Sequence, residues 1–163
     1  MTTLINASTS SGLVVTPDNS GAIALQNNGL TGLNISAIGQ VTMPLNVCFS
    51  AYAQATSAAN TIVYNAVYVN IGGCLNPSTG AFTAPVAGVY YLSAQFLANG
   101  GQGDLNLRVN GTNRACARGN GTTAAVSLHY QLAAGDVVTI YVSGVQAYGD
   151  GSGWSIFSGR LIQ

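Results

Sequence analysis

The stretch that decides the fold is NPSTGAFTAPVAGVYYLSA, residues 76–94, because it joins two turn signals to a run of bulky apolar residues. Gly80 and Gly88 predict bends, and Pro85 stiffens the chain where a strand begins. The run after Gly88 is rich in the β-branched and aromatic residues that strands favour. The stretch therefore predicts a turn followed by a buried strand, with no catalytic group in it.

Strand patterns continue on the C-terminal side of this stretch. The segment AAVSLHYQL (124–132) alternates apolar and polar residues, and VVTIYVS (137–143) does so after an Ala-Ala-Gly-Asp turn. The segment LNLRVNGTNRACAR (105–118) predicts a hairpin around Asn110-Gly111, a pair that tolerates the positive φ of a tight turn. No long window shows a helical period. Short strands separated by turn signals indicate an all-β sandwich or barrel.

The charge inventory excludes several classes of function. The chain of 163 residues holds four Asp, four Arg, no Lys and no Glu, so 5% of it is charged, against about 25% in ordinary soluble domains. Nucleic-acid binding needs a basic surface, and so does attachment to anionic lipid. We therefore expect neither partner. A chain that is 48% hydrophobic with zero net charge should associate, which favours a protein inside an assembly.

Neither a membrane span nor a secretory signal is expected. No run of apolar residues approaches the 18 or so that a transmembrane helix needs. The start, MTTLINASTSSG, has no basic residue and no apolar core.

The composition changes near Met43-Pro44. Residues 1–43 form an arm rich in Ser, Thr, Asn and Gly, and residues 44–163 carry all the Tyr and Phe. Within the arm, AIALQNNGLTGLNISAIG (22–39) predicts a small hairpin that pairs Ile23 and Leu25 with Leu33 and Ile35 across an Asn-Asn-Gly turn. Because an isolated hairpin is marginal in water, we expect the arm to dock on sister subunits or on another protein. The residues assigned to anchoring are Leu13, Val14, Val15, Ile23, Leu25, Leu33 and Ile35.

The sequence supplies little for catalysis. His129 is the only histidine, and it stands on the polar face of its predicted strand with no orienting acid nearby in the sequence. GNGTTA (119–124) matches a dinucleotide fingerprint formally, but a strand pattern follows it where that motif requires a helix. No GxSxG elbow is present. We expect no enzyme, no catalytic residue and no cofactor.

Three further features have a functional and a structural interpretation. Asp150, in AYGDGSGW (147–154), could offer oxygens to Ca²⁺ only if symmetry supplied three copies, and a surface turn is the alternative. Cys48, Cys74 and Cys116 contain no CxxC pair, and any intrachain disulfide would leave one thiol unpaired. Free, buried thiols are the structural interpretation. The eight tyrosines are assigned to the core and to subunit contacts, with sugar stacking by one or two as the alternative.

With the strands placed, four segments resemble the globular head of complement component one subunit q and the related tumour-necrosis-factor jelly rolls. They are STGAF (78–82), APVAGVYYL (84–92), LAAGDVVTIYV (132–142) and SIFSGRLI (155–162), and the likeness covers roughly residues 44–163. The resemblance implies a jelly-roll sandwich of about ten strands that forms a tight homotrimer. The residues then assigned to the core and the trimer contacts are Phe82, Tyr90, Tyr91, Leu92, Tyr130, Ile140 and Phe157.

The arm has a resemblance of its own. LVVTPDNSGAIALQNNG (13–29) resembles short repeats that precede such heads in bacteriophage virion proteins. This likeness implies a non-enzymatic surface protein of a tailed-phage virion, assembled in the bacterial cytoplasm. We expect a trimeric capsid decoration protein whose arm binds the major capsid protein or another virion protein. The alternative is a tail-fibre tip or adhesin that recognises a host glycan or protein through the loops 99–104, 117–123 and 147–154.

Overall fold

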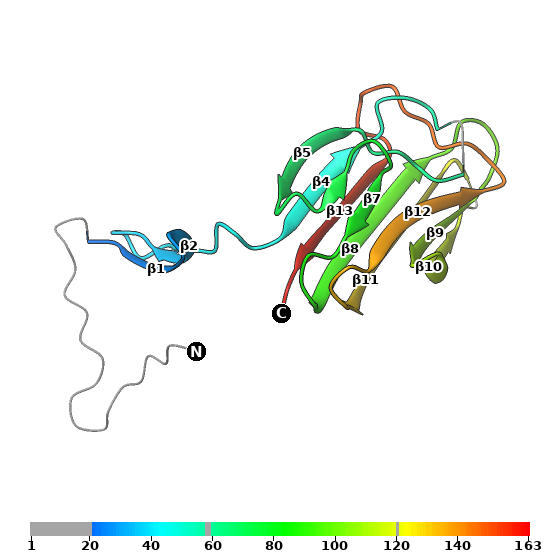
Figure 1. Cartoon of the computed structure of the whole chain (residues 1–163). Helices are drawn as coiled ribbons and strands as arrows, with labels where there is room; N and C mark the ends of the chain where they lie inside the picture. Colours follow the sequence, from blue (N-terminus) through cyan, green and yellow to red (C-terminus); the bar gives the residue numbers. More distant parts are fainter. Residues whose placement is uncertain (1–20, 58–59, 120) are drawn as a thin grey trace. The chain divides into compact units, whose positions relative to one another are not determined.

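The computed structural model describes residues 21–57, 60–119 and 121–163, and within them every regular element is a β-strand (Figure 1). Because these residues form no helix, none of them belongs to a helix able to cross a membrane. The chain divides into two compact units between Leu45 and Asn46, two residues after the boundary expected from composition.

The first unit contains a three-stranded antiparallel sheet of β1 (Ile23–Asn27), β2 (Leu30–Ile35) and β3 (Val41–Thr42). Asn28 and Gly29 form the turn between β1 and β2 with φ of 51° and 77°, values that Asn and Gly adopt readily. The register pairs Ile23 with Ile35 and Leu25 with Leu33, the pairs expected from the sequence. No described side chain of this unit is buried.

The second unit is a sandwich of two five-stranded sheets, in the strand orders β10-β9-β12-β7-β6 and β11-β8-β13-β4-β5. The ten strands agree with the expected jelly-roll sandwich. Their bounds are β4 (Cys48–Tyr52), β5 (Ala66–Ile71), β6 (Leu75–Asn76), β7 (Ala81–Thr83), β8 (Gly88–Leu97), β9 (Asp104–Val109), β10 (Thr112–Arg118), β11 (Thr123–Leu132), β12 (Val137–Ser143) and β13 (Ile156–Leu161).

Aromatic rings fill the space between the two sheets. Phe82 on β7 stacks on Phe49 at 4.7 Å between ring centroids, and Phe157 meets Phe49 edge-on at 4.7 Å. Tyr90 on β8 meets Phe82 edge-on at 5.5 Å. The stretch 76–94 thus supplies β7 and β8, one strand to each sheet, and its alternating inward residues help to build the core.

The two glycines of that stretch act differently from one another. Gly80 has φ of +72°, and a Cβ there would lie 3.0 Å from Val63 Cα. It therefore forms the expected bend and also lets two backbone segments meet. Gly88 has no positive φ. A Cβ on Gly88 would lie 2.5 Å from the carbonyl oxygen of Gln163, so this glycine is required by close approach, and residues 85–87 form the bend directly before it.

The expected core set divides between the two faces of its sheets. Phe82, Tyr90, Leu92, Ile140 and Phe157 are all fully buried. Tyr91 lies on the opposite face of β8 from Tyr90 and is half-buried, because successive strand residues point to opposite sides. Tyr130 is half-buried and packs against the rim of the core. Tyr91 is therefore not part of the sandwich interior, and its assignment to a trimer contact stays a prediction.

The hairpin expected around Asn110-Gly111 joins β9 to β10, with φ of 51° and 78° at the turn. The sequence pattern did not indicate the bulge in β10 between Asn113 and Ala115. Arg114 is the extra residue, and its guanidinium lies 5.8 Å from the centroid of the Tyr130 ring on the other sheet. The bulge thus directs one cation to the open edge of the sandwich.

Candidate functional site

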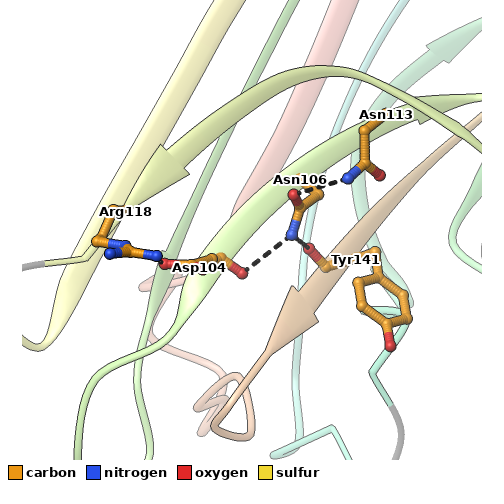
Figure 2. A network of polar contacts seen from close by, with 5 residues as sticks. All are labelled: Asp104, Asn106, Asn113, Arg118 and Tyr141. Carbon is orange, nitrogen blue, oxygen red and sulfur yellow. Dashed lines mark hydrogen bonds and ion pairs between the residues drawn. The ribbon is translucent and has the colours of Figure 1, made fainter.

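A network of polar side chains covers the outer face of β9, β10 and β12 (Figure 2). Asn106 on β9 is 7% exposed. Its Nδ2 donates to the backbone carbonyls of Asp104 and Tyr141, at 3.4 Å each, and its Oδ1 accepts from Asn113 Nδ2 at 3.1 Å. At the end of the network Arg118 Nε lies 3.3 Å from Asp104 Oδ1, in an exposed ion pair.

Arg108 and Tyr141 extend this network. The Arg108 guanidinium lies 3.4 Å from the centroid of the Tyr141 ring, and its Nε donates to Asn113 Oδ1 at 2.8 Å. The Tyr141 hydroxyl accepts from Asn60 Nδ2 at 2.6 Å. Because these groups satisfy one another, the network rigidifies the sheet and shows no nucleophile paired with a base.

A hollow of about 280 Å³ adjoins the Asp104–Arg118 pair. Backbone and small polar groups line it, namely Gln102, Gly103, Asp104, Arg118, Gly119, Ser143 and Gly144. Five of these residues belong to the loops 99–104 and 117–123 that the sequence assigned to recognition, whereas the polar network beside the hollow was not predicted. The sequence feature that could have indicated the polar network is the alternation in LNLRV, which places Asn106 and Arg108 together on one face of β9.

His129 lies on the outer face of the other sheet, opposite Tyr91 in the β11–β8 register. Its ring centroid is 5.2 Å from that of Tyr91, and its side chain is exposed. The strand position agrees with the sequence prediction. In the described part of the chain, no group of three or more metal-ligating side chains is gathered, at His129 or elsewhere.

Asp150 lies in a surface turn that uses its carboxylate. Its Oδ1 accepts the backbone N–H of Ser152 at 2.8 Å, and its Oδ2 accepts the Tyr148 hydroxyl at 3.2 Å. The Ser152 N–H bond lowers the pKa of the Asp150 carboxyl, and the bond to the carboxylate raises the pKa of the Tyr148 hydroxyl. This geometry is that of an Asx turn. It agrees with the surface turn that was the alternative to a Ca²⁺ site in AYGDGSGW.

Trp154 follows this turn and is 53% exposed. It borders a hollow of about 350 Å³ at the end of β8 and β11. Gln95 and Thr123 supply polar side chains beside the indole, and Ala125 leaves the space open. Of the loops assigned to recognition, this one presents an exposed indole.

The outer face of the sheet β11-β8-β13-β4-β5 is nearly free of charge. Its register aligns four serines in one row across four strands, Ser50, Ser158, Ser93 and Ser127. The next row contains Cys48, Arg160, Tyr91 and His129. A shallow hollow of about 420 Å³ lies between Cys48, Tyr91 and Arg160. Of the three arginines on the other sheet, Arg108 and Arg118 belong to the polar network and Arg114 occupies the bulge.

The three thiols are free, as expected, but they differ in burial. Cys74 is buried, Cys48 is half-buried and Cys116 is exposed. Burial raises the pKa of the Cys74 thiol, which makes it less reactive. The expectation of a buried thiol is wrong for Cys116, because β10 presents that position to solvent beside Arg118.

GNGTTA leads from β10 into β11 as a loop, with no helix among its described residues, as predicted. Of the residues assigned to anchoring, Leu13, Val14 and Val15 lie outside the described residues. Ile23 and Leu25 are exposed, and Leu33 and Ile35 are half-buried.

The profile of the C1q domain family matches residues 47–162. Multimerin-2 of Homo sapiens is 31% identical over 94 residues, which are 55% of this chain and 10% of multimerin-2.

Two solved structures share the fold. The globular domain of zebrafish complement 1qA protein superposes with a TM-score of 0.59 and 22% identity, covering 72% of this chain and 98% of that one. Murine APRIL superposes with a TM-score of 0.59 and 10% identity, covering 72% and 99%. Because the profile spans most of the chain and both five-stranded sheets, the protein belongs to the C1q domain family.

Proposed function

We propose that this chain is a non-enzymatic structural protein on the surface of a tailed-phage virion, assembled in the bacterial cytoplasm. In this proposal the C1q-like unit is a trimeric decoration on the capsid, and residues 1–43 anchor it to the major capsid protein or to another virion protein. C1q-like domains are generally non-enzymatic and form homotrimers, which supports self-association of this chain.

The observation that carries the anchoring role is the exposure of aliphatic side chains on the first unit. Ile23, Leu25 and Val41 are 37%, 51% and 62% exposed, although all three lie within strands. A sheet with an apolar face buries that face against another element. The resemblance of residues 13–29 to phage repeats supports a virion as the place where the first unit acts.

The distribution of charge supports a subunit contact on the sheet β11-β8-β13-β4-β5. Arg160 is the one charged side chain on the strands of that sheet, whereas the other sheet carries Asp104, Arg108, Arg114 and Arg118. Burying an unpaired charge is expensive, so the weakly charged face is the better surface to cover. Tyr91, half-buried on this face, is the residue we assign to the contact between subunits.

The anchoring role is tested with phage particles that lack this protein. The full chain and a variant without residues 1–43 are mixed with the particles, which are then pelleted and analysed for bound protein. We expect both proteins to be trimeric and only the full chain to pellet. Equal binding of the truncated variant, or no binding by either trimer, would contradict the anchoring role.

A second candidate function is host recognition by a tail-fibre tip or adhesin, and the exposed indole of Trp154 favours it. An aromatic ring beside the polar groups of Gln95 and Thr123 suits the apolar face and the hydroxyls of a sugar. On a glycan array, this function predicts binding that Trp154→Ala abolishes and Trp154→Phe partly keeps. Absence of array and cell binding by the full trimer would eliminate the adhesin.

A further inference from the structure

The three-stranded sheet of the first unit has one aliphatic face. Its register aligns Ile23, Ile35 and Val41 in one row across the sheet, and Leu25 with Leu33 in the next. Since strand residues alternate between faces, these five side chains project from the same side. We call this set the aliphatic face.

The opposite side of the sheet is polar. There the register aligns Ala24, Asn34 and Thr42, and Gln26 Nε2 donates to Thr31 Oγ1 at 3.3 Å. The sheet is therefore amphipathic, although nothing in the described first unit covers its aliphatic face. A sheet with one apolar and one polar side is built to pack against another layer.

The charge pattern indicates what that layer is. No charged residue occurs between Asp18 and Asp104, so the described residues of the first unit, 21–45, give the aliphatic face no charged rim. It cannot select a partner by opposite charge. A second copy of the same face is equally aliphatic and uncharged, so two copies can meet without desolvating a charge.

The connection to the C1q-like unit favours this partner. Leu45 is followed directly by Asn46, where that unit begins. If three C1q-like units associate, three copies of the sheet are tethered together, and short tethers give effective concentrations of about millimolar. A partner on another molecule has to compete with these tethered copies.

We propose that the aliphatic faces of three copies pack against one another around the threefold axis, with their polar sides outward, as a three-sided β-prism. This inference rests on the trimeric part of the proposed function. It changes the anchoring role, because the prism would bind the particle through its outer polar sides and through residues before Gly21. The aliphatic face itself would be filled by the protein's own subunits.

Cross-linking of the purified full chain, with no other virion component present, tests which molecule covers the face. p-Benzoylphenylalanine is placed at Leu33 on the aliphatic face and, in a matched variant, at neighbouring Asn34 on the polar side. After irradiation we expect covalent dimers and trimers from position 33, with a yield at least about fivefold above that from position 34. Equal yields, or linkage only within one chain from position 33, would overturn the prism.

Amide hydrogen exchange of charged variants gives an independent readout. Ile35→Asp puts three carboxylates together inside the prism, whereas Asn34→Asp places them outside. We expect exchange in residues 21–45 to be at least about tenfold slower in the wild type and in Asn34→Asp than in Ile35→Asp. Unprotected wild-type amides in the purified protein, or equal protection in both variants, would overturn the inference.

Light scattering separates the two possible failures. Both variants and the wild type should have about three times the 16.5 kDa chain mass. A wild-type protein of single-chain mass would overturn the trimer of the proposed function. A trimeric mass without the expected cross-links would overturn the prism alone.

Discussion

Tyr64 and Tyr90 are both fully buried, but their hydroxyl groups differ in hydrogen bonding. The Tyr90 hydroxyl donates to the Val86 carbonyl at 2.8 Å. The Tyr64 hydroxyl has no partner among the described residues, and burial raises its pKa well above the ordinary value. Removing these two hydroxyls should therefore change stability in opposite directions.

We expect Tyr64→Phe to raise the free energy of unfolding by about 1–2 kcal/mol, because it removes a buried polar group without a partner. Tyr90→Phe should lower it by about 1 kcal/mol, because it removes a satisfied bond and leaves the Val86 carbonyl unpaired. Urea unfolding at one protein concentration measures both. A loss of stability in Tyr64→Phe would show that its hydroxyl does have a partner, such as a buried water.

Some residue positions were predictable from the sequence and others were not. The period of two placed Ile140 inside the sandwich, because side-chain direction is a local property, whereas Phe82 was assigned to the core through the family resemblance. The close approach of Gly80 to Val63 was hidden, since it depends on a segment that meets the turn only after folding. The burial of Asn106 was hidden for the same reason, because groups from two other strands cover it.

Among the elements, two turns at one end of the sandwich are joined by a side-chain bridge. Asp136, in the turn between β11 and β12, accepts Asn110 Nδ2 at 2.8 Å and the backbone N–H of Ala133 at 2.8 Å. Asn110, in the turn between β9 and β10, accepts the backbone N–H of Val137 at 2.9 Å. These hydrogen bonds stabilise the ionised carboxylate and therefore lower the pKa of Asp136. The bond from Asn110 has the largest effect.

The lowered pKa gives this bridge a pH dependence. Because the folded-state pKa lies below the unfolded value, its contribution is complete above the unfolded pKa of about 3.9 and is lost as pH falls through the folded value. Asp136→Asn should be less stable than the wild type at neutral pH, and the difference should shrink as pH falls below about 4. Urea midpoints from pH 7 to pH 3 measure this, and a constant difference would contradict it.

Elements closed by local turns were the most predictable. The β1–β2 and β9–β10 hairpins have the expected turn residues, because Asn-Gly chemistry fixes them over a few positions. The division of strands between sheets was not readable from periodicity. β7 and β8 are neighbours in sequence, yet they belong to different sheets, and only long-range pairing decides this.

At the scale of the whole molecule, charge is distributed unequally between the two sheets. The polar network binds Arg108, Arg118 and Asp104 on one sheet, and the other presents rows of serine with Tyr91 and Arg160. The charge count of the whole sequence could not reveal this unequal distribution, because the distribution depends on which strands become neighbours. The candidate site was therefore less predictable than the fold.

Subunit association through the weakly charged sheet gives a direct prediction. Tyr91→Asp should reduce the mass in light scattering from about three times 16.5 kDa toward that of one chain, because it buries three carboxylates in the contact. Arg118→Asp, on the polar sheet, should leave the mass unchanged. Loss of association in Arg118→Asp but not in Tyr91→Asp would place the contact on the other sheet.

The pairing of β4 with β13 has a consequence for synthesis of the protein. β4 is the first strand of the sandwich and β13 the last, and β13 also pairs with β8 at the centre of its sheet. A nascent chain therefore lacks the middle of one sheet until β13 has left the ribosome. Pairing over such long separations makes folding slow. The β1–β2 hairpin, whose contacts are local, can form while the sandwich is still incomplete.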